Sequence, residues 1–153
     1  MSHPEEKLAE LGLKLPDVAK PVAAYVPAVR TGDLVYTSGQ LPLREGTLIA
    51  TGKVGGEVSA GVASECAQQC ALNALAAVKA EIGDLANVKR IVKAVVFIAS
   101  TPDFTGQPQV ANGASELFGQ VFGEAGQHAR SAVGVPVLPL DAPVEVELIV
   151  EVG

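Results

Sequence analysis

Residues 88–100, VKRIVKAVVFIAS, constrain the fold more than any other stretch of the chain. Their β-branched and aromatic side chains predict a β-strand. Side chains alternate between the two faces of a strand, and here both alternating sets are largely apolar. We therefore expect a central strand that is covered on both faces of its sheet. The two sets are Val92, Ala94, Val96 and Ile98, and Ile91, Lys93, Val95 and Phe97.

Two helices are predicted to cover one of these faces. Residues 57–82 carry small apolar side chains at helical spacing, and Gly83 with Asp84 ends the pattern. Residues 108–122 form a second apolar stripe. No loop of the sequence is long enough to cover the opposite face, so we expect another copy of the chain to cover it. The inward residues are Ala63, Cys66, Ala67, Cys70, Ala71, Ala74, Ala77 and Val78, then Val110, Ala114, Leu117, Phe118 and Val121.

The remaining strands complete one sheet. Residues 25–41 are typical of a hairpin that turns at residues 31–33, and Pro27 places its first strand at an edge. The last strand alternates cleanly, with Val144 starting its apolar face and Glu145 its polar face. The element order β-β-β-α-β-α-β-β indicates an α+β domain with two helices packed on one face of a mixed sheet. Further strands are expected at residues 48–54, 129–135 and 144–152.

The length of 153 residues suits a single domain. We expect residues 21–153 to form it. Residues 1–20 are expected to be an N-terminal extension with a short helix from Glu5 to Gly12.

The charge balance argues against nucleic acid as a partner. The sequence has 11 Lys and Arg against 17 Asp and Glu, and aromatic residues make up 4%. Nucleic-acid sites need clustered cations, and single strands also need aromatic platforms. Hydrophobic residues make up 48%, which predicts a folded core rather than disorder.

The N-terminus has no apolar core of a signal peptide, and no apolar run reaches membrane-spanning length. Cys66 and Cys70 have a spacing that suits a metal, but their apolar stripe favours buried, inert thiols. No membrane partner and a cytoplasmic location are therefore expected.

Arg130 and Glu145 stand near the starts of the last two strands. Arginine can hold a carboxylate through two parallel hydrogen bonds, and glutamate can act as a general base. Two other interpretations stay open. Arg130 could pair with an acidic residue at a subunit contact, and Glu145 could belong to a solvated edge with Glu147 and Glu151.

These residues belong to a longer pattern that resembles the reactive intermediate deaminase family, also called RidA or YjgF. The pattern runs from about residue 22 to the C-terminus, and its order is specific. It comprises Tyr25, LVYTSGQLP at residues 34–42, Asn112, RSAV at residues 130–133 and PVEVE at residues 143–147.

The resemblance implies a chorismate-mutase-like fold and a homotrimer with active clefts between subunits. It also implies hydrolysis of small enamine and imine acids to 2-keto acids and ammonia, with no cofactor or metal. Arg130 would then bind the carboxylate of the substrate, and Glu145 would act as general base or orient the water. Contacts to the substrate would come from Tyr25, Ser38, Gly39, Asn112 and Ala132.

The sequence departs from the family pattern in ways that indicate a longer subgroup. Ala23-Ala24 precede Tyr25 where Gly-Pro is common, and His128 stands where proline is common. His128 could touch the pocket or be a polar residue at a strand entry.

Three functions are compatible with these features. The first is an imine or enamine deaminase. The second is a non-catalytic trimer that binds a small carboxylate, or a hydrolase of a different small imine or amide. The third is a ribonuclease or translation inhibitor, against which the acidic charge argues.

One geometric condition applies to the deaminase. If the last two strands paired directly as a hairpin, Arg130 and Glu145 would lie at opposite ends of it. Both can reach one substrate only if the strands are not direct partners, or if different subunits supply the two residues.

Overall fold

The structure, a computed structural model, describes residues 3–18 and 24–153. Five strands form a mixed sheet in the order β1-β2-β7-β5-β6, and β3 and β4 form a separate two-stranded hairpin. The β5–β6 pair is parallel, and the other pairs of the large sheet are antiparallel. The strands are β1 (Ala28–Thr31), β2 (Leu34–Thr37), β3 (Leu43–Arg44), β4 (Thr47–Leu48), β5 (Val88–Ala99), β6 (Ala129–Val135) and β7 (Val144–Val152).

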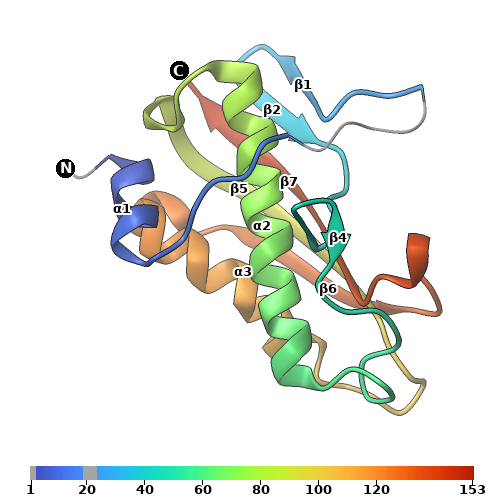
Figure 1. Ribbon diagram of the computed structural model, residues 1–153. Coiled ribbons are helices and arrows are strands. Elements are labelled where there is room, and N and C mark those ends of the chain that lie inside the picture. The colour runs from blue at the N-terminus through green and yellow to red at the C-terminus, as the bar shows by residue number, and fades with distance from the viewer. Residues whose placement is uncertain (1–2, 19–23) are drawn as a thin grey trace.

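Two long helices, α2 (Ala60–Ile82) and α3 (Gln107–Phe122), lie on one face of this sheet (Figure 1). Ser59 caps the start of α2, where its hydroxyl accepts a hydrogen bond from the Val62 amide, and Gly83 at φ 86° ends the helix. Every residue assigned to an inward helical stripe from the sequence is buried. The predicted α+β fold is therefore confirmed. Short 3₁₀ helices η1 (Leu85–Asn87), η2 (Gly123–Gly126) and η3 (Pro139–Asp141) join the larger elements.

The predicted first hairpin is confirmed, but the prediction of a third strand at residues 48–54 is wrong. Strand β1 lies at an edge of the sheet, as Pro27 indicated, and Gly32 makes the turn at φ 58°. Residues 48–54 do not form a strand of the large sheet, and only Val54 bridges to it, at Ser100 after the end of β5. The chain instead folds back at Glu45 and Gly46, whose positive φ angles of 52° and 81° suit the tight turn between β3 and β4.

Strand β5 is central, but it does not alternate strictly. Its pairing with β7 shifts register between Ile91 and Lys93. A β-bulge of this kind adds a residue to one strand and changes which face the following side chains occupy. Ile91 therefore joins Ala94 in the core beneath the helices, while Val92 is only half-buried. The faces predicted for Ile91 and Val92 were wrong for this reason.

Loops cover one end of the opposite sheet face, contrary to the expectation that no loop could do so. Phe97, Ala99 and Val135 pack there against side chains from two connections, Leu41, Leu48, Leu138 and Ala142. The rest of that face is open in the single chain. Val29, Tyr36 and Val133 are 53%, 43% and 43% exposed there.

The N-terminal segment forms α1 (Pro4–Glu10), which packs beside α3 and buries Leu8 (Figure 1). The helix predicted in this segment is present. The expected domain boundary at residues 20 and 21 lies outside the described residues. Within residues 3–18 and 24–153, no helix has the length and apolar character needed to cross a membrane.

Candidate functional site

Arg130 lies on edge strand β6, level with Ala94 of β5. Because Ala94 faces the helices, Arg130 faces them too. Its Nη1 donates to Asn112 Oδ1 at 2.7 Å and to Ser115 Oγ at 3.1 Å, and both partners lie on α3. Across the described parts of the chain, no carboxylate lies within ion-pair distance of this guanidinium. The hydrogen-bond partners that position this guanidinium are therefore neutral side chains.

Ser115 is itself positioned by His128. Nδ1 of His128 lies 2.6 Å from the Gly126 carbonyl oxygen, which can only accept, so Nδ1 carries the proton. Nε2 then accepts a hydrogen bond from the Ser115 hydroxyl at 2.8 Å, and the Ser115 oxygen accepts from Arg130. The rings of His128 and Phe118 pack edge to face, with ring centroids 5.4 Å apart. We call this chain of contacts the Ser115–His128 relay.

Sequence reasoning missed Ser115 and left the role of His128 open. A signal for Ser115 was present, because it lies three residues after Asn112 on a helix and so on the same surface. No comparable signal existed for His128. Its contact depends on how η2 returns the chain to the start of β6.

Glu145 lies near the start of β7, level with Phe97 of β5, and faces away from the helices. Its carboxylate lies directly over the backbone of Gly39, and a Cβ at that position would collide with Oε2. Glycine, which has no side chain, permits this close approach. Burial raises the pKa of the Glu145 carboxyl above its ordinary value, and the nearby negative charge of Glu147 raises it further.

Ser38 fixes the backbone next to Gly39. Its hydroxyl donates to the Val26 carbonyl at 2.6 Å, and its amide donates to the Pro27 carbonyl at 2.8 Å. These bonds hold the segment that follows Tyr25 against the end of β2, and Tyr25 is 52% exposed. Ser38, Gly39 and Glu145 thus form a compact group, which we call the glutamate half-site.

The second group comprises Arg130, Asn112, Ser115 and Ala132, which we call the arginine half-site. Ala132 lies two residues after Arg130, faces the same side of β6 and packs partly against the core. All the predicted site residues except Tyr25 therefore belong to one of two half-sites.

One chain does not bring the two half-sites together. Strand β5 separates β6 from β7, so the last two strands are not direct partners. Arg130 faces the helices and Glu145 faces the opposite side of the sheet. They are offset by three residues along β5 and by two strand spacings, about 14 Å between Cα atoms at standard sheet dimensions.

Cys66 and Cys70 are fully buried in the small-residue stripe of α2. Burial raises the pKa of the Cys66 thiol to about 11 and raises that of Cys70 well above its ordinary value, so both favour the uncharged thiol. No group of three or more metal-binding side chains gathers within residues 3–18 and 24–153.

A model of the family described as "YjgF/chorismate_mutase-like, putative endoribonuclease" matches residues 5–152. The chain belongs to this family. The family and the chorismate-mutase-like fold expected from the sequence are thus confirmed. The YjgF match also includes most of the N-terminal extension, which the sequence motifs did not reach.

Two relatives and one structure show how closely YjgF proteins resemble this chain. Protein TCP17 of Trypanosoma cruzi is 46% identical over 147 residues, which cover 95% of this chain and 92% of that protein. The 2-iminobutanoate/2-iminopropanoate deaminase of Dermatophagoides farinae is 33% identical, with coverage of 90% and 93%. A crystal structure from Shewanella oneidensis, which carries the endoribonuclease description, has a TM-score of 0.96 at 32% identity and covers 99% of this chain and 100% of that one.

Proposed function

We propose that the protein is a hydrolytic deaminase of small enamine and imine acids, with its active sites between the subunits of a homotrimer. The observation that carries the proposal is the division of the site into two half-sites on opposite faces of one sheet. Each half holds one of the two groups that the reaction needs. A second copy of the chain can supply the missing half.

The arginine half-site is suited to bind a carboxylate. Asn112 and Ser115 engage Nη1 of Arg130 and leave other N–H groups of the guanidinium for a ligand. A planar guanidinium can bind a carboxylate through two parallel hydrogen bonds. The small imino acids released by amino-acid dehydratases carry such a carboxylate next to the reacting carbon.

The glutamate half-site is suited to activate water. The raised pKa of Glu145 makes its carboxylate a better proton acceptor than an ordinary glutamate. Glu145 takes a proton from water as the water oxygen bonds to the imine carbon, and this proton is returned to the imine nitrogen to give a neutral carbinolamine. The hydroxyl proton of the carbinolamine then passes to its amino nitrogen, the carbon–nitrogen bond breaks with its electron pair on nitrogen, and a 2-keto acid and ammonia leave. No electron donor or acceptor is needed.

The open part of the sheet supports assembly. Val29, Tyr36 and Val133 form exposed apolar surface on the face opposite the helices, and Ile149 lies beside Tyr36 in the same sheet. Exposed apolar surface of this kind marks protein–protein contacts. The homotrimer itself comes from the family resemblance, and the two free cysteines suit a reducing, cytoplasmic setting.

A ribonuclease is the rival that the family description names. The net charge of −6 and the low aromatic content give little to bind phosphates or stack bases. A trimer that binds a small carboxylate without turning it over would use the same arginine half-site, so turnover must separate these two functions.

The turnover experiment couples the purified protein to a threonine dehydratase, which releases 2-iminobutyrate, and follows 2-ketobutyrate formation. We expect faster keto-acid release than with the dehydratase alone, and loss of that gain with Arg130→Ala and with Glu145→Gln. Absence of any acceleration by the wild-type protein would exclude the deaminase.

Mixed assemblies test the location of the site. Arg130→Ala and Glu145→Gln chains are unfolded together in equal amounts, refolded and assayed. If Arg130 and Glu145 act from different subunits, about one quarter of the sites in random mixed trimers regain both groups and the mixture is active. If the two residues act from one chain, no site regains both and the mixture stays inactive.

A further inference from the structure

A groove lies between the N-terminal extension, the β3–β4 hairpin and α2. Its volume is about 690 Å³, within the range of roughly 300–1,000 Å³ that is usual for small-molecule sites. Residues 12–18 form one wall, residues 43–46 form the second, and Gln69, Leu72 and Asn73 of α2 form the floor. No residue of either half-site lines this groove.

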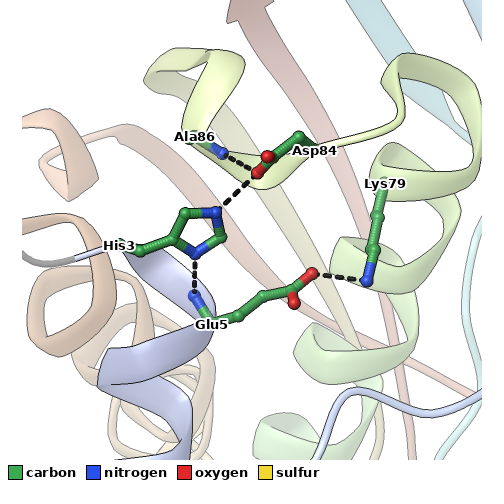
Figure 2. A network of polar contacts seen from close by, with 5 residues as sticks. All are labelled: His3, Glu5, Lys79, Asp84 and Ala86. Carbon is green, nitrogen blue, oxygen red and sulfur yellow. Dashed lines mark hydrogen bonds and ion pairs between the residues drawn. The ribbon is translucent and has the colours of Figure 1, made fainter.

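The extension wall is fixed at its N-terminal end (Figure 2). Nε2 of His3 lies 2.7 Å from Asp84, and Glu5 forms an ion pair with Lys79 of α2. Leu8 is 2% exposed and anchors α1 in the core. The loop that follows α1 therefore starts from a docked helix, so it can serve as a stable wall.

A chain of amide side chains runs along the floor of the groove. Asn73 Nδ2 donates to the carbonyls of Leu41 at 2.9 Å and Leu43 at 3.0 Å, which leaves Asn73 Oδ1 as an acceptor. Gln69 Nε2 donates to that oxygen at 3.1 Å. Gln69 Oε1 then accepts from Nε of Arg44 at 3.2 Å. Both amide residues are 6% exposed, so the bond between Gln69 and Asn73 is shielded from water.

This chain of bonds determines how Arg44 presents its charge. Nε is occupied by Gln69, and the tight turn at Glu45 and Gly46 holds the backbone next to Arg44. In the described ranges, no carboxylate lies within ion-pair distance of the Arg44 guanidinium. The two Nη groups are left in a parallel arrangement that matches a carboxylate.

The other side chains of the groove limit what can bind. Leucines from both walls and the floor supply apolar surface beside Arg44, and Lys14 adds a second cation. Asp17 and Glu45 carry negative charge in the same groove and oppose a multiply charged anion such as a phosphate ester. The apolar residues are Leu13, Leu15, Leu43 and Leu72.

We propose that this groove binds a small organic monocarboxylate with an apolar chain, its carboxylate on the Nη groups of Arg44 and its chain along the leucines. The site requires neither catalysis nor a second copy of the chain. It is therefore independent of the deaminase proposal.

The probe is sodium octanoate, with uncharged octanamide as its matched control. In ¹⁵N-labelled full-length protein, octanoate is expected to shift the side-chain amide signals of Gln69 and Asn73 in a saturable way. Octanamide, and octanoate with Arg44→Gln, should bind at least about tenfold more weakly, because a charge-assisted hydrogen bond is lost. Leu13→Asp should also weaken octanoate, because it places a carboxylate in the apolar wall.

Two arginine variants control for other sites. Nε of Arg30, like that of Arg44, donates a hydrogen bond to a neutral oxygen, here the Gly32 carbonyl. Arg30 does not line the groove, so Arg30→Gln should leave octanoate binding unchanged. Arg130→Gln should also leave the groove signals unchanged. Equal affinity for octanoate and octanamide would overturn the proposal. So would full binding by a folded Arg44→Gln protein, or shifts confined to the Asn112 amide near Arg130.

Discussion

The two half-sites hold their charged groups by different means. Arg130 is held by side chains, because Asn112 and the Ser115–His128 relay direct its guanidinium. Glu145 is positioned by steric fit, because its carboxylate occupies the space that a side chain at Gly39 would fill. One group is oriented by polar neighbours, and the other is made more basic by burial.

This difference matches the two tasks proposed for them. A group that binds a carboxylate works best when it is charged and rigidly placed; the charge belongs to the guanidinium itself, and the hydrogen bonds fix its position. A general base works best when its pKa approaches the working pH, and burial provides that shift. The arginine half-site should therefore govern substrate binding, and the glutamate half-site should govern the rate of the chemical step.

The largest expected effect is on the glutamate side. Glu145→Gln keeps the shape but removes the proton acceptor, so kcat should fall about 100-fold, the lower end for general base catalysis because imines also hydrolyse unaided. Affinity for 2-ketobutyrate, measured by calorimetry, should remain. Unchanged kcat would remove Glu145 from the mechanism.

On the arginine side, Arg130→Ala should reduce kcat/KM about 30-fold, because the carboxylate loses its charged partner. The loss should fall mainly on KM, in contrast to Glu145→Gln. Arg130→Lys restores the charge without the planar guanidinium, so its kcat/KM should lie between those of wild type and Arg130→Ala. If Arg130→Ala lowers only kcat, the division of tasks between the half-sites is wrong.

Gly39→Ala tests whether shape alone positions Glu145. The new Cβ would push the carboxylate aside, but this end of the glutamate side chain is flexible, so kcat should fall about tenfold, less than the roughly 100-fold that a full ångström of misplacement can cost. Gly119→Ala is the control. No atom lies within 4 Å of a Cβ at that exposed helical position, so it should keep full activity and gain stability.

The Ser115–His128 relay predicts a smaller effect. With Ser115→Ala or His128→Ala, Arg130 keeps its bond to Asn112, so KM should rise about threefold while kcat stays unchanged. Glu116→Gln, a change to the exposed neighbour of Ser115, should alter neither constant. Equal KM values for all three variants would mean that the relay serves folding alone.

The smallest effect concerns pH. Glu145 must be ionised to accept a proton, so kcat should decline as pH falls through its raised pKa. Glu147→Gln removes the nearby negative charge and should move this decline to lower pH, while Glu151→Gln, farther along β7, should move it less. A pH–rate profile for each variant provides the measurement.

The same shift has a consequence for stability. Because the folded-state pKa of Glu145 lies above its unfolded value, the folded protein loses stability as pH rises through that interval. Glu145→Gln should therefore unfold at a higher temperature than wild type near neutral pH. This gain should vanish below the ordinary glutamate value of 4.5.

Local patterns in the sequence determined much of this protein. The alternation from Val144 to Val152, the small-residue stripe of α2 and the turn at Gly32 each predicted the element that formed. Each pattern reflects the contacts of one strand, helix or turn with its immediate surroundings. Such contacts repeat every two residues in a strand and about every 3.6 in a helix, so a single sequence contains them.

Only the tertiary structure decided how these elements meet. The sequence did not show that β5 lies between β6 and β7, that a bulge turns Ile91 into the core, or that Arg130 and Glu145 face opposite ways. Strand order and register depend on pairings between residues far apart in the chain, and a one-residue shift reverses the face of every side chain that follows. The identities of Arg130 and Glu145 came from the sequence, whereas their separation on one chain came from the sheet.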